Sequence, residues 1–232
     1  MHPLELARAV RPEVDAAVQV AEVRFAGAEL QSTLRLSPST VNASTVVIRF
    51  ERSVHAAWTQ PRERFEASAV AVIGRVLSLV KRTAPAIKAV QLDYDCPTQH
   101  LARWAGLLRA LRAGGALEDW ELWTTSLIAQ LREPSFGPLF RGLVAGHVVQ
   151  VFDTGELADQ AARAQLAWLL KRADMPFRVG IGSFERGRGS MQLTQHERWW
   201  PVVAELAVSP QFRGTWVFAA GQPWAERARS LP

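Results

Sequence analysis

The stretch Gln91-Leu92-Asp93-Tyr94-Asp95-Cys96-Pro97 decides how this chain is read. The apolar run from Ala89 to Leu92 predicts a buried strand that ends in two carboxylates. Because side chains alternate along a strand, Asp93 and Asp95 are expected on the same side of it. Two neighbouring acids cost stability through repulsion and desolvation, which favours a functional role. A helix-capping role would explain Asp95 alone, because one cap needs only one acid.

Strands and helices alternate on both sides of this stretch. Apolar runs predict strands at Val20–Phe25, Thr45–Phe50, Lys88–Asp95, Glu121–Ser126, His147–Phe152, Phe177–Ser183 and Thr215–Ala219. Helical spacing predicts helices at Leu4–Val18, Arg62–Val80, Thr98–Ala113, Ala158–Lys171 and Trp200–Val208. Repeated strand–helix units of this kind are typical of a parallel α/β fold.

The order of elements predicts a TIM-like (β/α)8 barrel in a single domain spanning residues 1–232. Seven main strands follow one another from Val20, with Thr33–Leu36 as a side hairpin, whereas a complete barrel has eight. Since the chain opens on a predicted helix, the missing strand is the first. We therefore expect the barrel to be incomplete at the N-terminus. A partner, such as a second copy in a homo-oligomer, could cover the open edge.

Composition narrows the class of protein. The 232 residues are 48% hydrophobic, which allows a substantial core, and the net charge of +5 comes almost wholly from scattered arginines. A nucleic-acid-binding protein usually carries a basic stripe, so we do not expect a nucleic acid partner. Cys96 is the single cysteine, which rules out a disulfide within the chain.

The sequence also bears on location. No apolar run reaches the length of a membrane span, and residues 1–13 contain acids, arginine and two prolines, unlike a signal peptide. We expect a chain that is soluble as written, with its compartment unknown. An envelope location stays open if the true start lies upstream of Met1.

Polar and aromatic residues gather where the predicted strands end. Because the carboxyl ends of parallel strands meet at one mouth, acids from several strands there suit general acid/base work on a polar substrate. We predict three catalytic residues and four substrate-binding residues. The catalytic candidates are Asp95, Asp93 and Asp153, and the binding candidates are Trp216, Glu185, Arg49 and Thr125.

Three segments carry a resemblance to a known family. They are QLDYDCPTQHLARWAGLLRALR from Gln91, VVQVFDTG from Val148, and MPFRVGIGSF from Met175. In these segments the chain resembles an uncharacterised bacterial family, domain of unknown function 3142, over about Thr45 to Phe184. That family is placed among TIM-barrel proteins related to glycoside hydrolases. The resemblance implies the fold more firmly than a reaction.

The chain is also distantly similar to chitinase-like glycoside hydrolases, whose fourth strand carries D-x-x-D-x-D-x-E with the Glu as general acid. The last two acids of that motif fall on Asp93 and Asp95, so Asp95 would replace the Glu with a side chain one methylene shorter. The first two acids fall on Lys88 and Gln91, and both are lost.

The same resemblance extends to two further strands. The sixth-strand M-x-Y-D falls on 150–153, where Asp153 survives and the Tyr is Phe152. The last-strand Trp, which forms the floor under the sugar, would be Trp216. Because such enzymes need that Tyr to use the substrate's N-acetyl oxygen as nucleophile, the resemblance does not imply retained chitinase chemistry.

Several functions stay open at this point. A glycoside hydrolase-like enzyme acting on an oligosaccharide or polysaccharide is favoured, and a non-catalytic carbohydrate-binding barrel or a scaffold protein are the alternatives. Cys96 with His100 could form a nucleophile pair, and Asp93, Asp95 and His100 could bind a divalent metal. The sequence shows neither a full metal-ligand spacing nor a nucleotide fingerprint, so we expect no metal and no cofactor.

Overall fold

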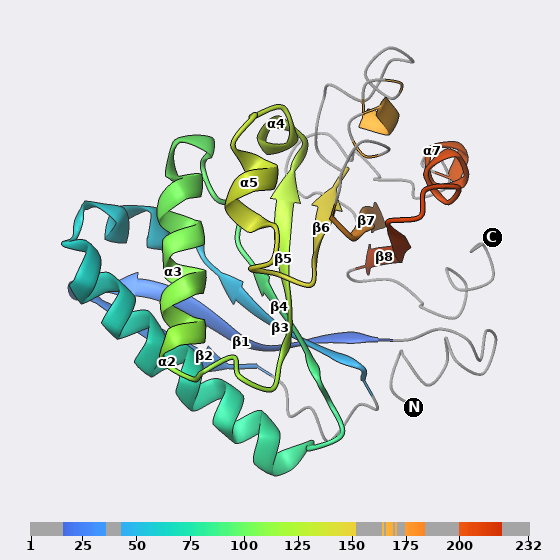
Figure 1. The fold of residues 1–232 in the computed structure, drawn as a ribbon. Coiled ribbons are helices and arrows are strands. Elements are labelled where there is room, and N and C mark those ends of the chain that lie inside the picture. The colour runs from blue at the N-terminus through green and yellow to red at the C-terminus, as the bar shows by residue number, and fades with distance from the viewer. Residues whose placement is uncertain are drawn as a thin grey trace, which may run out of the picture. The chain divides into compact units, whose positions relative to one another are not determined.

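The structure, a computed structural model, describes residues 16–35, 43–151, 164, 166–168, 170, 175–183 and 200–219. The chain divides into two compact units, one from Asp15 to Gly146 and the other containing the residues from His147 onward. Each unit is built on strands, shown as arrows in Figure 1. The prediction of one domain over residues 1–232 stays a prediction.

The first unit has a five-stranded sheet with the order β2-β1-β3-β4-β5. Its strands are β1 (Ala17–Ala26), β2 (Glu29–Leu34), β3 (Thr45–Phe50), β4 (Ala89–Asp93) and β5 (Glu121–Leu127). All neighbouring strands in this sheet are parallel except β1 and β2, which form an antiparallel hairpin. In β3, five of six residues are buried, as is usual for a parallel strand covered on both faces.

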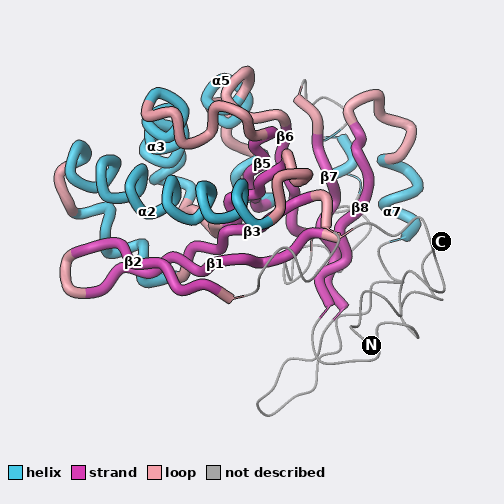
Figure 2. Tube along the Cα trace, turned by 90° about the horizontal axis from the view of Figure 1, so that it is seen from below, coloured by secondary structure: helices cyan, strands magenta, loops and turns pink. Residues whose placement is uncertain are grey.

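Two long helices, α2 (Arg62–Thr83) and α3 (Leu101–Ala113), cover one face of this sheet, as the view in Figure 2 shows. In α2 the buried residues recur every three or four positions, which gives the helix one apolar side to lay on the strands. Shorter helical segments complete the unit. They are η2 (Arg52–Thr59), η3 (Thr98–His100), α4 (Ile128–Leu131) and α5 (Phe136–Phe140).

An aromatic cluster joins the helices to the ends of β3 and β4. The ring of Phe50 lies 5.2 Å from that of Trp104 and 5.7 Å from that of Tyr94, with the rings tilted or edge-on. The indole Nε1 of Trp58 in η2 donates a hydrogen bond to the Tyr94 hydroxyl. All four side chains are buried, so the polar ends of Trp58 and Tyr94 partner each other within the core.

The second unit contains the parallel strands β6 (Gly146–Gln150), β7 (Phe177–Ser183) and β8 (Phe212–Ala219), with the helix α7 (Trp200–Leu206). At Gly180 in β7 the neighbouring strands come close. A Cβ added there would lie 2.9 Å from Cε2 of Phe218, which is tighter than real contacts, so a larger residue would need the Phe218 ring to shift.

All seven predicted main strands are present, and the predicted side hairpin is β2. The outer edge of β1 carries the antiparallel β2 where a closed barrel would need another parallel strand. The fold is therefore an α/β fold of the TIM-barrel type that is incomplete at β1, as predicted. The hairpin itself covers that edge over Ala21–Ala26.

One predicted helix is wrong where it can be checked. Leu4–Val18 was expected to be helical, but Ala17 and Val18 belong to β1, in which buried and half-buried residues alternate at the start. The alternating pattern at the start of β1 was missed because Val18 also fits the helical spacing of the apolar residues before it, which lie outside the described part. The residues of the predicted helix Ala158–Lys171 that the structure describes are helical.

The β1–β2 hairpin turns on Gly27 and Ala28, which have φ angles of 60° and 65°. A two-residue turn with both residues in the left-handed region matches the twist of the strands, and Gly or Asn usually fills it. This conformation lowers the stability of the fold at Ala28, because the Cβ comes close to the following carbonyl oxygen, and glycine has no Cβ.

We expect Ala28→Gly to raise the free energy of unfolding by roughly 1 kcal/mol, as measured by denaturant titration. Gly27→Ala is the matched control and should lower it, although a Cβ at Gly27 would meet nothing within 4 Å. Equal or opposite effects of the two substitutions would show that the turn is not strained at Ala28.

Candidate functional site

Parallel pairing brings the ends of β3 and β4 together in register. Arg49 of β3 is the partner of Asp93, and Gln91 is the partner of Trp123 in β5. Paired residues of neighbouring parallel strands face the same side, so these four side chains share one face of the sheet. Polar residues that are separated along the sequence thus meet at one end of the sheet.

That face is the one turned away from α3. Thr124 and Thr125 are consecutive in β5 and face opposite sides. The indole Nε1 of Trp104 in α3 donates a hydrogen bond to the Thr124 hydroxyl over 3.0 Å. Thr125 therefore points away from α3, as do its contact Asp93 and the rest of that face. In a TIM barrel this side of the strands is the interior.

A chain of hydrogen bonds links three side chains on this face. The Gln91 amide Nε2 donates to the Thr125 hydroxyl over 3.0 Å, and that hydroxyl donates to Oδ1 of Asp93 over 2.6 Å. Gln91 is 1% exposed and Thr125 is 3% exposed. Because Gln91 occupies the hydroxyl oxygen with a donor, the hydroxyl proton is directed at Asp93.

The Asp93 carboxyl has an altered acidity. Burial raises its pKa above the usual 3.8, the Thr125 hydrogen bond lowers it, the nearby charge of Asp95 raises it, and the Arg49 guanidinium lowers it. Burial is the largest of these influences, so the pKa is raised. A desolvated carboxyl beside a second acid is an arrangement in which the two groups lose their protons at different pH.

Asp95 differs from Asp93 in being exposed. The sequence left open whether it caps the following helix. The residues at the N-cap positions of η3 and α3 are Pro97 and His100, and neither makes a side-chain capping hydrogen bond. Asp95 is thus not the N-cap residue of either helix, and it is exposed where Asp93 is half-buried.

Cys96 is unsuited to the nucleophile role that the sequence left open. Its side chain is 1% exposed, and its Sγ donates to the carbonyl oxygen of Pro97 over 3.4 Å. Burial raises the pKa of the thiol to about 12. Because the thiolate is the reactive form, this cysteine is inert near neutral pH and helps to pack the end of β4.

His100 lies in a cluster of aromatic and cationic groups beside this strand end. Its ring stacks on Trp58 with centroids 5.7 Å apart, and Arg103 of α3 lies over the same indole at 5.4 Å. Burial, Arg103 and His55 together lower the pKa of His100. The Arg103 guanidinium also donates to the carbonyl oxygens of Trp58 and Gln60, which ties α3 to η2.

No group of three or more metal-ligating side chains stands together in the described part of the chain. Asp93, Asp95 and His100 therefore do not form the metal site that was left open. Among the same residues, no helix has the length and apolar character that crossing a membrane requires.

The remaining predicted site residues belong to the second unit. Trp216 in β8 is half-buried, and the guanidinium of Arg178 lies over its ring at 5.0 Å from the centroid. One face of that indole is therefore occupied by a cation. Asp153 and Glu185 lie outside the described residues, and their roles stay predictions.

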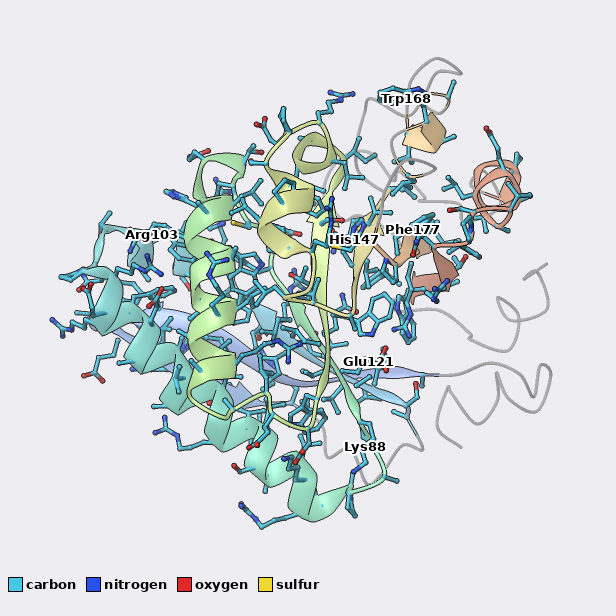
Figure 3. The ribbon with its side chains drawn as sticks, viewed as in Figure 1. Lys88, Arg103, Glu121, His147, Trp168 and Phe177 are labelled. Carbon is cyan, nitrogen blue, oxygen red and sulfur yellow. The ribbon has the colours of Figure 1, made fainter. Side chains whose placement is uncertain are left out.

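The two residues that align with the lost acids of the chitinase-like motif, Lys88 and Gln91, lie at different places in the fold. Lys88 is exposed just before β4, near Glu121 at the start of β5, which is the opposite end of the strand from Asp93 (Figure 3). Gln91 is buried within β4 and holds Thr125. Gln91 was missed as a site residue, although an amide inside an otherwise apolar strand is the signal that could have revealed it.

Comparison with solved structures shows similarity to three proteins. A GH18 chitinase from Pseudoalteromonas aurantia is similar with a TM-score of 0.56 and 13% identity, over 81% of this chain and 76% of that one. An agarase is similar with a TM-score of 0.45 and 13% identity, over 78% of this chain and 38% of that one. A mutant tryptophan synthase alpha-subunit from Pyrococcus furiosus is similar with a TM-score of 0.41 and 12% identity, over 80% of this chain and 63% of that one.

The similarity to the chitinase supports the fold of this chain but not its activity or substrate, because the sequence identity is only 13%. No protein-family model and no curated protein sequence matches the chain. The resemblance to the uncharacterised bacterial family therefore stays a prediction, whereas the α/β fold of the TIM-barrel type is shown.

The raised pKa of Asp93 predicts how the stability of the fold depends on pH. The folded state holds the Asp93 proton to higher pH than the unfolded chain, so the wild type loses stability as the pH rises above 3.8, until Asp93 is ionised in both states. Asp93→Asn keeps an acceptor for Thr125 and cannot ionise. We expect it to raise the melting temperature at neutral pH, with a gain that shrinks as the pH falls towards 3.8.

Thermal unfolding of both proteins across this pH range is the measurement. Asp119→Asn is a control of opposite sign, because the exposed Asp119 bonds to Lys81 and its pKa is lowered. A destabilised Asp93→Asn protein at neutral pH would mean that the ionised carboxylate is the form that the fold favours.

Proposed function

We propose that this protein is a glycoside hydrolase-like enzyme that acts on an oligosaccharide or polysaccharide by carboxylate acid/base chemistry. The observation that carries the proposal is the pair of acids at the carboxyl end of β4. Asp93 is half-buried, with a pKa that desolvation raises, and Asp95, two residues on, is exposed. Acids with such different surroundings divide the acid and base roles of glycoside hydrolysis.

Asp95 is the proton donor in this proposal. It gives its proton to the glycosidic oxygen as the bond from that oxygen to the anomeric carbon breaks. Water supplies the hydroxyl that the sugar gains, and the remaining proton of that water passes to a carboxylate of the site. Asp93 tunes Asp95, because a negative charge on one carboxyl makes its neighbour hold a proton more firmly. The Thr125 hydroxyl orients Asp93, and Arg49 is the cation on the same face.

Residues of other strands complete the proposal. Asp153 is the second catalytic carboxylate of the proposal, and its separation from Asp95 would decide between inversion and retention of configuration. Trp216 and Glu185 contact the sugar. For Trp216, Arg178 lies over one face of the ring, so stacking on a sugar would use the other face.

A second candidate is a carbohydrate-binding barrel without catalysis. The observation that favours it is the Gln91 amide, which is buried in the hydrogen-bond chain at a position where the similar chitinase motif has an acid. A neutral amide cannot share a proton with Asp93. If this loss disables proton transfer, the mouth would keep its polar lining and bind sugar without cleaving it.

Asp95→Asn separates the two functions. For the enzyme, we expect kcat/KM to fall by about 10²- to 10⁴-fold, with oligosaccharide affinity nearly unchanged, because general acid catalysis is lost and binding is retained. The measurement is release of reducing ends from chito-, cello-, xylo- and agaro-oligosaccharides, with binding followed by calorimetry. Asp119→Asn is the matched control, because it removes a carboxylate from an exposed turn that is not part of the proposed site.

The competing results are distinct. An active protein whose Asp95→Asn variant keeps its full kcat/KM would contradict the assigned role. A protein that binds one of these sugars without cleaving it, and that loses binding in Trp216→Ala more than in Asp95→Asn, is a carbohydrate-binding barrel.

A further inference from the structure

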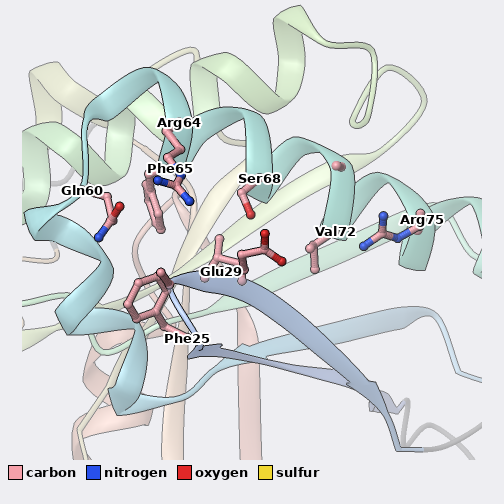
Figure 4. Close-up of a pocket in the computed structure, with 11 residues that line it drawn as sticks. Phe25, Glu29, Gln60, Arg64, Phe65, Ser68, Val72 and Arg75 are labelled. Carbon is pink, nitrogen blue, oxygen red and sulfur yellow. The ribbon is translucent and has the colours of Figure 1, made fainter.

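A groove of about 320 Å³ runs between α2 and the β1–β2 hairpin. Figure 4 shows side chains of α2 along one wall, and Phe25 and Glu29 of the hairpin facing them. Its floor is apolar, and polar groups stand along its rim. The apolar side chains include Phe25, Leu30, Phe65 and Val72, and the polar ones are Glu29, Gln60, Arg64, Ser68 and Arg75.

This groove is separate from the acids of β4. Its hairpin and helix residues lie on the face of the sheet that α2 covers, whereas Asp93 and Thr125 lie on the opposite face. The sheet itself stands between the two places. A ligand in the groove is therefore not the substrate proposed for the acids.

Two cations flank the groove without partners. Arg64 and Arg75 are exposed, and neither has an ion pair or hydrogen bond with any residue that the structure describes. By contrast, Arg62 on the same helix is paired with Glu66 over 2.7 Å. The two guanidiniums outnumber the single carboxylate of Glu29, so the groove favours an anionic ligand.

Two residues of the edge strand β2 are part of the groove lining. Among the described strands, β2 pairs with β1 alone. The backbone N–H of Arg35 donates to the carbonyl of Val20 across the hairpin, and such bonds alternate along an antiparallel ladder. The N–H and C=O groups of Leu30, Ser32 and Leu34 therefore point outward. The edge lacks proline and lysine, which commonly protect an exposed strand.

The spacing of the two arginines sets the length of the ligand. Eleven residues of α helix separate Arg64 from Arg75, which is about 16 Å. An extended peptide covers that distance with about five residues. Residues one, three and five of such a peptide would face α2, with the middle one over the apolar floor.

We propose that β2 accepts an extended acidic peptide of a partner protein as an added strand. The peptide backbone bonds to the outward groups of Leu30, Ser32 and Leu34. Its alternate side chains enter the groove, and acidic side chains at its ends pair with Arg64 and Arg75. Main-chain bonds give affinity in this mode of recognition, and the side chains give specificity.

The test uses a fluorescein-labelled peptide, Glu-Thr-Val-Thr-Glu, and fluorescence anisotropy at low salt with the whole chain. Lys-Thr-Val-Thr-Lys is the charge-reversed control, and a backbone N-methylated Glu-Thr-Val-Thr-Glu cannot donate to β2. We expect the acidic peptide to bind and both controls to bind at least about tenfold more weakly.

Protein variants test the two parts of the site separately. Ser32→Pro removes an outward N–H and leaves the bonds to β1 in place, and Arg64→Glu/Arg75→Glu reverses the flanking charges. Each should weaken binding about tenfold. The control Arg82→Glu/Arg109→Glu makes the same change in net charge at exposed sites outside the groove and should leave binding unchanged.

Several results would overturn the proposal. They are absence of binding by the acidic peptide, equal binding of the lysine or N-methylated peptide, and a Ser32→Pro protein that is folded by circular dichroism and binds as the wild type does. A wild-type dimer in analytical ultracentrifugation that Ser32→Pro dissociates would also overturn it, because a second copy would then occupy the edge.

Discussion

The hydrogen bond from the Thr125 hydroxyl to Asp93 is the interaction on which the candidate site depends. It exists because β4 and β5 pair in parallel with Gln91 opposite Trp123, which brings Thr125 level with the end of β4. A shift of this register by one residue would turn the threonine to the helix side and leave the buried carboxyl without its donor. The Gln91 amide then fixes the direction of the hydroxyl proton. Residues at three strand positions thus set the hydrogen bonding of the Asp93 carboxyl.

The opposite face of the same strands explains why this end of the sheet is well held. Tyr94 lies between Asp93 and Asp95 in sequence, and its ring packs 5.0 Å from Trp104 on the helix side. The Trp58 indole donates to the Tyr94 hydroxyl, so η2, α3 and β4 are joined at one buried point. The aromatic layer thus anchors the backbone that carries both acids, one of which is half-buried and the other exposed.

The sequence was sufficient to predict the strands, because runs such as Thr45–Phe50 are apolar throughout and bounded by polar residues. It was also sufficient to predict that Asp93 and Asp95 end a strand. It could not predict which residue Asp93 contacts, because Thr125 is 32 residues away and only the strand register brings the two together. The role of Gln91 was missed for the same reason.

Local signals failed where tertiary context decided the outcome. The start of β1 carries a helical spacing, yet its residues pair with β3 and become a strand. The hairpin was recognised, but its turn at Gly27 and Ala28 was not, because alanine seldom takes a positive φ. That no other described strand pairs with β2 likewise follows from topology and leaves no mark in the sequence of that strand.

The most direct test of this account is an NMR titration of the Asp93 side-chain carboxyl with ¹³C-labelled aspartate. The account predicts a pKa above the usual 3.8 in the wild type, a higher value still in Thr125→Val, and a lower one in Asp95→Asn, because the threonine bond lowers this pKa and the neighbouring charge raises it. An Asp93 that titrates at the usual value, and that responds to neither substitution, would contradict the claim that a desolvated carboxyl, with a pKa set by Thr125 and Asp95, stands at the end of β4.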